Sequence, residues 1–344
     1  MSMEGGTAMK KKAVFLTTKQ GRRNLSRVYS PHALGIIKEY ADLYGEPVEG
    51  ENPDEHREYL RDAEVAFSTW GMPAFTEQTI ESFLPKLKVV FYAAGSVQYF
   101  ARPFLKKGIK VVSAWAANAV PVAEYTLSQI LLANKGFYQN MARTKKNYRE
   151  AREYFLEFPG NYSAKVGILG AGMVGKKVIE LLKPFNLQIL VYDPFLPETA
   201  AREMGVVKCG LEEIFSSCQT ISNHIANLPE TVGLLSRKHF DRMLPNATFI
   251  NTGRGAQVVE KDLIEALREQ PGRTAVLDVT DPEPVKPDSG FLSMENVFLT
   301  SHIAGSSGKE VERMSLYMAE EFVRYVKNEE LKYNVTPDML KTMA

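Results

Sequence analysis

The chain has 344 residues, and its 42 Lys and Arg residues almost balance 41 Asp and Glu residues, which leaves a formal net charge of +1. A chain with so little net charge has no broad positive field for a phosphate backbone, so we expect no nucleic-acid partner. No apolar run approaches the roughly 20 residues that cross a bilayer, so we expect a soluble protein with no membrane partner.

The chain begins with a segment that we exclude from the fold. Residues 1–8 contain Gly5 and Gly6 and precede a second Met, so we interpret them as a disordered leader or a tag remnant. The apolar run after Lys12 is too short for a secretory signal, and we therefore expect a cytoplasmic protein. The two cysteines, Cys209 and Cys218, have neither metal-ligand spacing nor a disulfide pattern. We predict reduced thiols and no metal site.

Short apolar runs and helix-like segments alternate along the whole chain. In the first third, the apolar runs begin at Ala13, Glu64, Lys88 and Ile109, and residues 32–45 (HALGIIKEYADLYG) have a helical pattern. A second series runs through KVGILG, QILVYD, QTISNH, ATFINT, TAVLDV and VFLTSH. This alternation is typical of β/α units around a parallel sheet. At roughly 150 residues per domain, the length predicts two α/β domains.

The segment GAGMVG, residues 170–175, follows a strand-like run and opens a helix-like one. In this context the glycines permit a tight turn, a close approach of a pyrophosphate, and close packing of helix on strand, while free N–H groups at the helix start face the anion. The alternative is an ordinary strand-to-helix turn. We predict a dinucleotide site that includes Gly170, Gly172, Met173, Val174 and Gly175.

Asp193 ends the next strand-like run, roughly 20 residues beyond the glycine segment. An acidic side chain at this place can bind a ribose 2′-hydroxyl and repel a 2′-phosphate, which favours NAD over NADP as the cofactor. Asp193 also precedes Pro194, so a role limited to forming a turn is the alternative.

Polar side chains follow three further strand-like runs. Arg254 comes after ATFINT, Glu283 after TAVLDV, and His302 after VFLTS, and Asp278 ends a strand of the same series. Because the carboxyl ends of parallel strands lie at one edge of the sheet, we expect these residues to converge there, on the edge that carries the glycine turn.

These residue types suit the reduction of a 2-keto acid. An imidazole can give a proton to the carbonyl oxygen, a carboxylate can fix the tautomer of that imidazole, and a guanidinium matches a carboxylate in two-point contact. We assign these roles to His302, Glu283 and Arg254. Taken singly, each residue has a structural alternative. His302 could be a hydrogen-bonded structural histidine, Glu283 could be a solvent-exposed acid in a turn, and Arg254 could bind a cofactor phosphate or a helix end. His224 is the one rival acid or base, and we interpret it as a wall of the cofactor pocket.

At these residues the sequence resembles the D-isomer-specific 2-hydroxyacid dehydrogenase family. The match runs from about residue 88 to residue 308, with VGILGAGMVG, VYDPFLPE, NTGRGAQVV, LDVTDPEP and SHIAGSS in family order. The resemblance implies that Arg254 binds the substrate carboxylate and carbonyl, that His302 is the acid/base, and that Glu283 is its partner. It also implies that Asp278 helps to hold the nicotinamide. We further expect His224 and Thr252 to lie beside the cofactor.

The resemblance further implies a discontinuous architecture. We expect a Rossmann NAD-binding domain over residues 118–308 and a smaller flavodoxin-like substrate domain over residues 9–117 and 309–344. The substrate carboxylate would meet the loop at Ala94, Gly95 and Ser96, with Trp70 nearby. Members of the family are usually homodimers joined through the cofactor domains, so the resemblance implies a homodimer here.

Several positions depart from the family pattern. Trp70, Met72, Gln98 and Tyr99 replace more polar residues on the expected substrate side. The expected activity is interconversion of a small D-2-hydroxy acid and its 2-keto acid, similar to that of glyoxylate or hydroxypyruvate reductases. Because of these departures, the sequence leaves the identity of the substrate open. The alternatives are an NAD-sensing protein similar to corepressors of this fold, or an enzyme similar to formate or phosphite dehydrogenases. Formate dehydrogenases have a glutamine in place of Glu283, which argues against formate.

Overall fold

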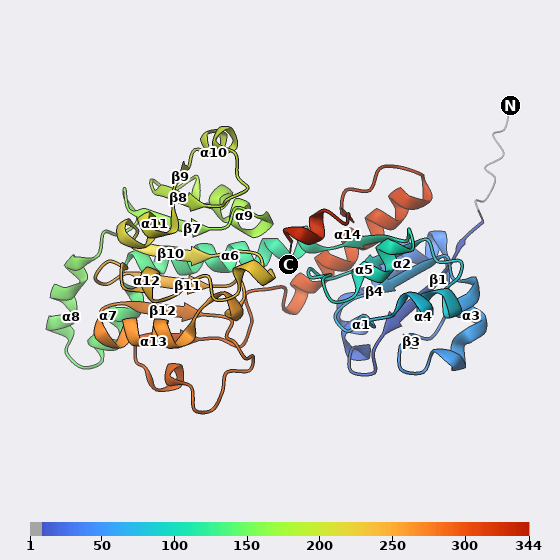
Figure 1. Ribbon diagram of the computed structural model, residues 1–344, viewed down its shortest axis with the longest axis horizontal. Helices are drawn as coiled ribbons and strands as arrows, with labels where there is room; N and C mark the ends of the chain where they lie inside the picture. The colour runs from blue at the N-terminus through green and yellow to red at the C-terminus, as the bar shows by residue number, and fades with distance from the viewer. Residues whose placement is uncertain (1–8, 344) are drawn as a thin grey trace. The chain divides into compact units, whose positions relative to one another are not determined.

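The computed structural model describes residues 9–343, and the chain folds as two compact units (Figure 1). Of the described residues, the first unit contains 9–118 and 306–343, and the second unit is Ala119–Gly305. The expected leader, residues 1–8, lies outside the described residues. The labels of substrate-binding and NAD-binding domain remain predictions.

The first unit is built on a seven-stranded sheet with the order β14-β6-β5-β4-β1-β2, and β3 pairs with β1 beside this path. All pairs are parallel except β14 with β6. Without the short β3, the order β2-β1-β4-β5-β6 is the flavodoxin-like order 2-1-3-4-5. The strands are β1 (Lys11–Thr17), β2 (Ala41–Leu43), β3 (Val48–Glu49), β4 (Val65–Ser68), β5 (Val89–Tyr92), β6 (Lys110–Ser113) and β14 (Asn334–Val335).

Helices cover both faces of this sheet. Along β1, Val14 and Leu16 point into one apolar cluster, and Ala13 and Phe15 point into the other, as the twofold alternation of a strand requires. On the second face, Phe322 from the returning chain meets Phe67 and Phe91 of the sheet edge to face. The helices are α1 (Arg22–Val28), α2 (Pro31–Tyr40), α3 (Arg57–Asp62), α4 (Glu77–Phe83), α5 (Ala101–Lys106) and α14 (Val311–Val326).

The predicted helix over residues 32–45 was wrong at its end. Helix α2 stops at Tyr40, and the next three residues form β2, which pairs in parallel with the start of β1. Ala41 is 3% exposed and contributes to the core as a strand residue. The backbone bonds offered by the free edge of β1 outweigh the local helical pattern, because tertiary pairing overrides a weak propensity.

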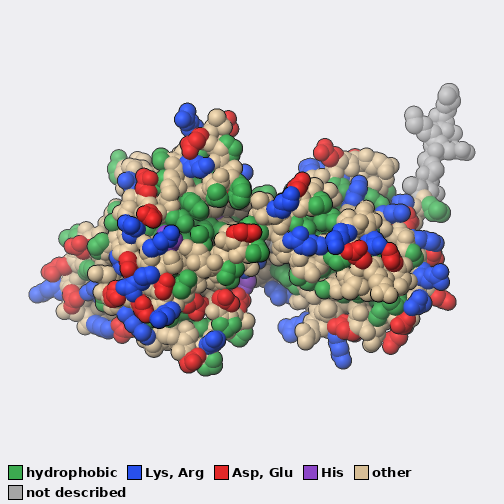
Figure 2. All heavy atoms as spheres, in the orientation of Figure 1, with side chains coloured by type: hydrophobic (Ala, Val, Ile, Leu, Met, Phe, Trp, Pro, Cys, Tyr) green, Lys and Arg blue, Asp and Glu red, His purple; other side chains and the backbone are tan. Residues whose placement is uncertain are grey.

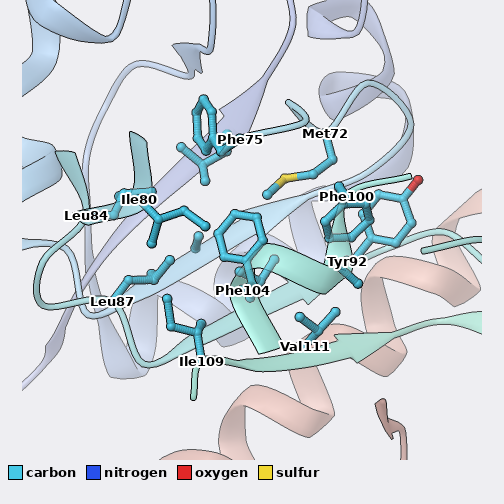
Figure 3. Close-up of a cluster of buried hydrophobic side chains, with 14 of the residues drawn as sticks. Met72, Phe75, Ile80, Leu84, Leu87, Tyr92, Phe100, Phe104, Ile109 and Val111 are labelled. Carbon is cyan, nitrogen blue, oxygen red and sulfur yellow. The ribbon is translucent and has the colours of Figure 1, made fainter. Parts of the chain in front are cut away.

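Met72 lies in the buried apolar cluster drawn in Figure 3, which corrects a second expectation. We expected Met72 on the substrate side, but it is 2% exposed and belongs to the core. Figure 3 shows its side chain among aromatic rings that include Phe75, Phe100 and Phe104. Methionine is unbranched and polarisable, so it fills an irregular gap between rings. Met72 therefore stabilises the first unit from within.

The second unit has a seven-stranded, fully parallel sheet with the order β13-β12-β11-β10-β7-β8-β9. The order β9-β8-β7-β10-β11-β12 is the Rossmann order 3-2-1-4-5-6, extended at one edge by β13. The predicted fold class is thereby confirmed. The strands are β7 (Lys165–Leu169), β8 (Gln188–Tyr192), β9 (Val207–Lys208), β10 (Thr220–Asn223), β11 (Thr248–Asn251), β12 (Thr274–Leu277) and β13 (Val297–Leu299).

Two apolar clusters again lie on the two faces of the sheet. One face is covered by side chains of α11, α12 and α13, and the other by side chains of α6, α7, α9 and α10. The helices are α6 (Trp115–Asn134), which begins in the first unit, α7 (Phe137–Thr144), α8 (Tyr148–Tyr154), α9 (Met173–Leu182), α10 (Glu198–Met204), α11 (Leu211–Ser217), α12 (Arg237–Phe240) and α13 (Glu260–Glu269).

On the face seen in Figure 2, basic and acidic side chains are interspersed. None of the described helices combines the length and the apolar character of a membrane span. Within residues 9–343, His, Cys, Asp and Glu side chains form no group that could hold a metal ion.

Candidate active site

The glycine turn lies between the carboxyl ends of β7 and β10, where the strand order of the second unit reverses. Gly170 has φ +91°, and a Cβ there would lie 2.7 Å from the carbonyl oxygen of His224. A Cβ on Gly175 would lie 2.0 Å from the carbonyl oxygen of Gly170, so α9 packs directly on the turn. These two glycines are required by packing.

Gly172 is different, because a Cβ built there meets nothing within 4 Å. It caps the start of α9, whose first two residues are Met173 and Val174. The open space lies beside backbone N–H groups at a helix N-terminus, which is the donor set that a pyrophosphate needs. The residues present therefore fit a dinucleotide.

Asp193 follows β8 and contacts the glycine turn directly. Its Oδ2 accepts a hydrogen bond from the Ala171 N–H at 2.7 Å. Its Oδ1 accepts from the N–H groups of Phe195 and Leu196 at 2.8 and 3.1 Å. Asp193 thus forms the turn that we considered as its alternative role, and the same carboxylate lies at the glycine turn. Its contact with a ribose remains a prediction.

His224 follows β10 and lies among hydroxyl groups. Its Nε2 is 2.9 Å from Ser222 Oγ, and its Nδ1 is 3.4 Å from Thr252 Oγ1. Desolvation lowers the pKa of His224 to about 3, so its ring is neutral near pH 7. A neutral ring without a carboxylate partner is unsuited to donate a proton, which favours our interpretation of His224 as a pocket wall.

His302 and Glu283 form a hydrogen-bonded pair. The Nδ1 atom of His302 lies 2.7 Å from Glu283 Oε1, and both side chains are partly open to solvent, at 42% and 45%. Because the carboxylate accepts a hydrogen bond from Nδ1–H, Nε2 is left to face a substrate. Among the described residues Nε2 has no hydrogen-bond partner.

The backbone at His302 adopts the left-handed conformation, with φ +59°. The buried carboxylate of Asp278 holds this conformation in place: its Oδ1 accepts from Thr300 Oγ1 at 2.6 Å and from the Ile303 N–H at 2.8 Å. Its Oδ2 accepts from the Ala304 N–H at 2.9 Å, and the His302 N–H donates to the Asp278 carbonyl oxygen at 3.0 Å. Asp278 therefore shapes the turn that presents His302. Its expected contact with a nicotinamide remains a prediction.

Arg254 follows β11, one strand away from the element that leads to Glu283. Its Nη1 donates to the Gly253 carbonyl oxygen at 2.7 Å. Burial lowers the pKa of Arg254, and the Glu283 carboxylate acts in the opposite direction. A guanidinium keeps its charge at neutral pH in either case. The structure thus brings a cation, a carboxylate and an imidazole together on one rim of the sheet.

The expected substrate loop belongs to the first unit and follows β5. Ser113 Oγ donates to the carbonyl oxygens of Ala94 and Gly95, at 2.8 Å in both cases. In the described part of the chain, the N–H groups of Gly95 and Ser96 have no acceptor. Trp70 follows the neighbouring strand β4 and packs against both apolar clusters of this unit.

Two of the unusual residues near this loop have contacts of their own. We expected Gln98 on the substrate side, but its Nε2 donates to the carbonyl oxygens of Leu340 and Met343 at 2.8 and 2.7 Å. Gln98 therefore anchors the C-terminal segment. Tyr99 is 51% exposed, and its hydroxyl lies 3.4 Å from that of Tyr92.

Three buried amide side chains next to the Arg254 backbone were not predicted from the sequence: Asn223, Asn251 and Gln257. Asn223 and Asn251 are the last residues of two fully buried strands, TISN and TFIN. A polar residue at the carboxyl end of such a strand was the signal that could have revealed them.

The family model of the D-isomer specific 2-hydroxyacid dehydrogenase NAD binding domain matches residues 127–304. The chain is 31% identical over 306 residues to the D-3-phosphoglycerate dehydrogenase of Methanocaldococcus jannaschii, a match covering 88% of this chain and 57% of that protein. It is 27% identical to the glyoxylate reductase of Korarchaeum cryptofilum, with 93% and 94% covered.

The chain spans about half the length of two of the D-3-phosphoglycerate dehydrogenases that it matches, 57% of one and 42% of the other. Among solved structures, a phosphoglycerate oxidoreductase from Rhizobium etli superposes with a TM-score of 0.78 at 20% identity, covering 96% of this chain and 100% of that one. At that identity the superposition shows the fold alone.

A pair of glycine variants separates the two requirements at the turn. In Gly172→Ala the methyl group enters open space, so thermal stability should stay the same while NADH affinity falls about tenfold or more, because the methyl occupies the path of the pyrophosphate. In Gly175→Ala the methyl meets backbone, so stability should fall by about 1–3 kcal/mol as well. Thermal melts and NADH fluorescence titration measure both effects, and unchanged NADH affinity in Gly172→Ala would contradict the site.

The lowered pKa of His224 predicts an acid-sensitive step in stability. The folded state keeps the ring neutral down to about pH 3, whereas an unfolded histidine binds a proton near pH 6.5. The contribution is therefore complete above pH 6.5 and is lost as the pH falls toward 3. We expect the melting temperature of His224→Gln to fall less than that of the wild type between pH 7 and pH 4. Parallel curves for the two proteins would show that His224 is not the titrating group.

Proposed function

We propose, because this chain belongs to the D-isomer specific 2-hydroxyacid dehydrogenase family, that it interconverts a small D-2-hydroxy acid and its 2-keto acid with NAD. The observation that supports this most directly is the 2.7 Å bond between His302 and Glu283, with the Arg254 guanidinium in the field of the same carboxylate. Reduction of a 2-keto acid requires a proton donor for the carbonyl oxygen and a cation that binds the carboxylate, and both lie on this rim.

In this proposal His302 gives a proton from Nε2 to the carbonyl oxygen during reduction and takes it back during oxidation. Glu283 accepts a hydrogen bond from Nδ1–H and thereby keeps the ring in one orientation. The left-handed backbone at His302, held by the buried Asp278, sets the direction of the ring. Sparsely populated conformations of this kind cluster at functional sites, because surrounding contacts must sustain them.

Arg254 binds the substrate carboxylate and polarises the carbonyl group. Its partial burial strengthens both effects, since charge interactions grow as water is excluded. In the first unit, the N–H groups of Gly95 and Ser96 offer further donors to a carboxylate, and Trp70 follows the neighbouring strand. We propose these residues of the first unit as substrate-binding residues.

The cofactor is NAD, which supplies or accepts the hydride when it is bound. Gly170, Gly172 and the start of α9 hold its pyrophosphate, and Asp193 lies at the same turn. The negative charge of Asp193 would oppose the 2′-phosphate of NADP, so we propose a preference for NAD.

The function is tested by offering glyoxylate, hydroxypyruvate and longer 2-keto acids with NADH or NADPH and following the loss of absorbance. We expect turnover of at least one acid, with NADH preferred. His302→Ala should lower kcat by about a hundred- to ten-thousand-fold with NADH affinity nearly unchanged, because the imidazole acts on the substrate oxygen. Arg254→Ala should raise KM and also lower kcat.

The exposed His32 provides the matched control, and His32→Ala should keep wild-type kinetics. Wild-type rates in His302→Ala would remove His302 as the proton donor. Binding of NADH without turnover of any 2-keto acid would contradict the proposed activity and favour an NAD-sensing protein instead.

We also propose a homodimer joined through the second unit. Large apolar side chains are exposed along residues 132–162 of this unit, and such a concentration is typical of an interface. They are Leu132, Phe137, Met141, Tyr148, Leu156 and Tyr162. We expect light scattering to give twice the chain mass of 38.6 kDa, and Phe137→Glu with Met141→Glu to give the monomer mass. A wild-type monomer would contradict this proposal.

A cytoplasmic location remains part of the proposal. Cys209 and Cys218 are free, and burial raises the pKa of these thiols to about 11 and 12. Unpaired, protonated thiols are compatible with a reducing compartment.

A further inference from the structure

Three amide side chains are buried directly behind Arg254. Asn223 and Gln257 are 0% exposed, and Asn251 is 1% exposed. Asn223 and Asn251 are the last residues of the neighbouring strands β10 and β11 and lie opposite each other in the parallel register. Gln257 ends the short helical turn that follows Arg254. The strand ends and the turn therefore bring the amides into one cluster.

The amides bond to one another. Asn223 Nδ2 donates to Asn251 Oδ1 at 3.0 Å and to Gln257 Oε1 at 2.6 Å, which uses both of its protons. Asn223 Oδ1 accepts from the Ile225 N–H at 3.2 Å, and Gln257 Nε2 donates to the Ile225 carbonyl oxygen at 2.5 Å. Because each oxygen faces donors and each nitrogen faces acceptors, turning any of these amides over would oppose like groups.

The same cluster binds the backbone of Arg254 on both sides. Gln257 Oε1 accepts from the Arg254 N–H at 3.4 Å, and Asn251 Nδ2 donates to the Arg254 carbonyl oxygen at 3.1 Å. Asn251 Oδ1 also accepts from the Gly253 N–H at 3.1 Å. The next residue, Gly255, packs so closely that a Cβ would lie 2.0 Å from the carbonyl carbon of Thr280. The Arg254 backbone is thus fixed by the amide hydrogen bonds and by the close packing of Gly255 against Thr280.

Stability alone does not require such a cluster. Burying an amide costs free energy that its hydrogen bonds roughly offset, whereas apolar side chains of similar size fill the same space at little or no loss. A fully bonded polar cluster does, however, specify one geometry. A long side chain amplifies small movements of its own backbone, and a displacement of about 1 Å can lower a rate a hundredfold.

We propose that Asn223, Asn251 and Gln257 are positioning residues that hold Arg254 in its substrate-binding geometry. Through Ile225 they also connect the Arg254 turn to the segment after His224, so the anion receptor and the pocket wall keep a constant separation. This inference rests on the proposed function, because the cluster affects substrate binding only if Arg254 binds the substrate.

The test uses apolar variants of similar size, Gln257→Met and Asn223→Leu, and their double variant. We expect kcat/KM for the 2-keto acid to fall about 10- to 100-fold in each single variant, mainly through a higher KM. The inhibition constant of oxamate, a non-reducible analogue of a 2-keto acid, should rise in parallel. Since the two residues act as one unit, the double variant should lose less than the product of the single losses.

Gln139 provides the matched control, because it is a buried glutamine of the same unit whose amide donates to two backbone carbonyl oxygens. We expect Gln139→Met to lower the melting temperature without changing kcat/KM. If activity follows melting temperature alike in Gln139→Met and Gln257→Met, the cluster is merely structural and the inference is overturned.

Amide hydrogen exchange separates this inference from the proposed function, because it needs no turnover. In Gln257→Met the peptide that contains Arg254 should exchange at least about tenfold faster than in the wild type, while peptides of the first unit stay unchanged. Unchanged exchange overturns the inference whatever the activity, and so does faster exchange with an unchanged KM. A wild type that reduces no 2-keto acid overturns the proposed function, and exchange then decides whether the amides hold Arg254.

Discussion

The parallel register of the second sheet is the constraint on which the candidate site depends. Strands β7 and β10 to β13 run in one direction, so five separate chain segments turn at the same edge. Each turn carries one component: the glycine turn, His224, Arg254, Glu283 and His302. A register shift of one residue would send the side chains of a strand to the opposite face and would displace the turn that follows it. The paired ends of the strands, such as Asn223 beside Asn251, therefore determine where the chemistry is possible.

Buried carboxylate and amide side chains next to the rim fix the backbone of the turns that carry His302 and Arg254. Asp278 uses both oxygens to hold the chain around His302, and the amide cluster does the same for Arg254. Neither set of groups needs to meet a substrate to have this effect. Their partners are mostly backbone groups of the turns themselves, so the cost of an unusual conformation is offset locally by satisfied hydrogen bonds.

The two histidines on the rim have different properties because the groups around them differ. His224 lies among hydroxyl groups, and desolvation lowers its pKa to about 3. His302 has a carboxylate at 2.7 Å and a second ring nitrogen left free by the described residues. Both histidines follow a strand of the same sheet, and their different surroundings suit His302 to proton transfer and His224 to a wall of the pocket.

The sequence by itself determined the features that depend on neighbours along the chain. The alternation of apolar runs with helical segments predicted two α/β units, and the glycines of residues 170–175 predicted the turn, because periodicity and backbone freedom are local properties. Convergence of Arg254, Glu283 and His302 also followed, since parallel strands end at one edge. Only the tertiary structure decided that residue 41 starts a strand, that Met72 belongs to a core, and that three amides hold Arg254. Those outcomes depend on segments distant in sequence: the free edge of β1, the rings around Met72, and the register of β10 with β11.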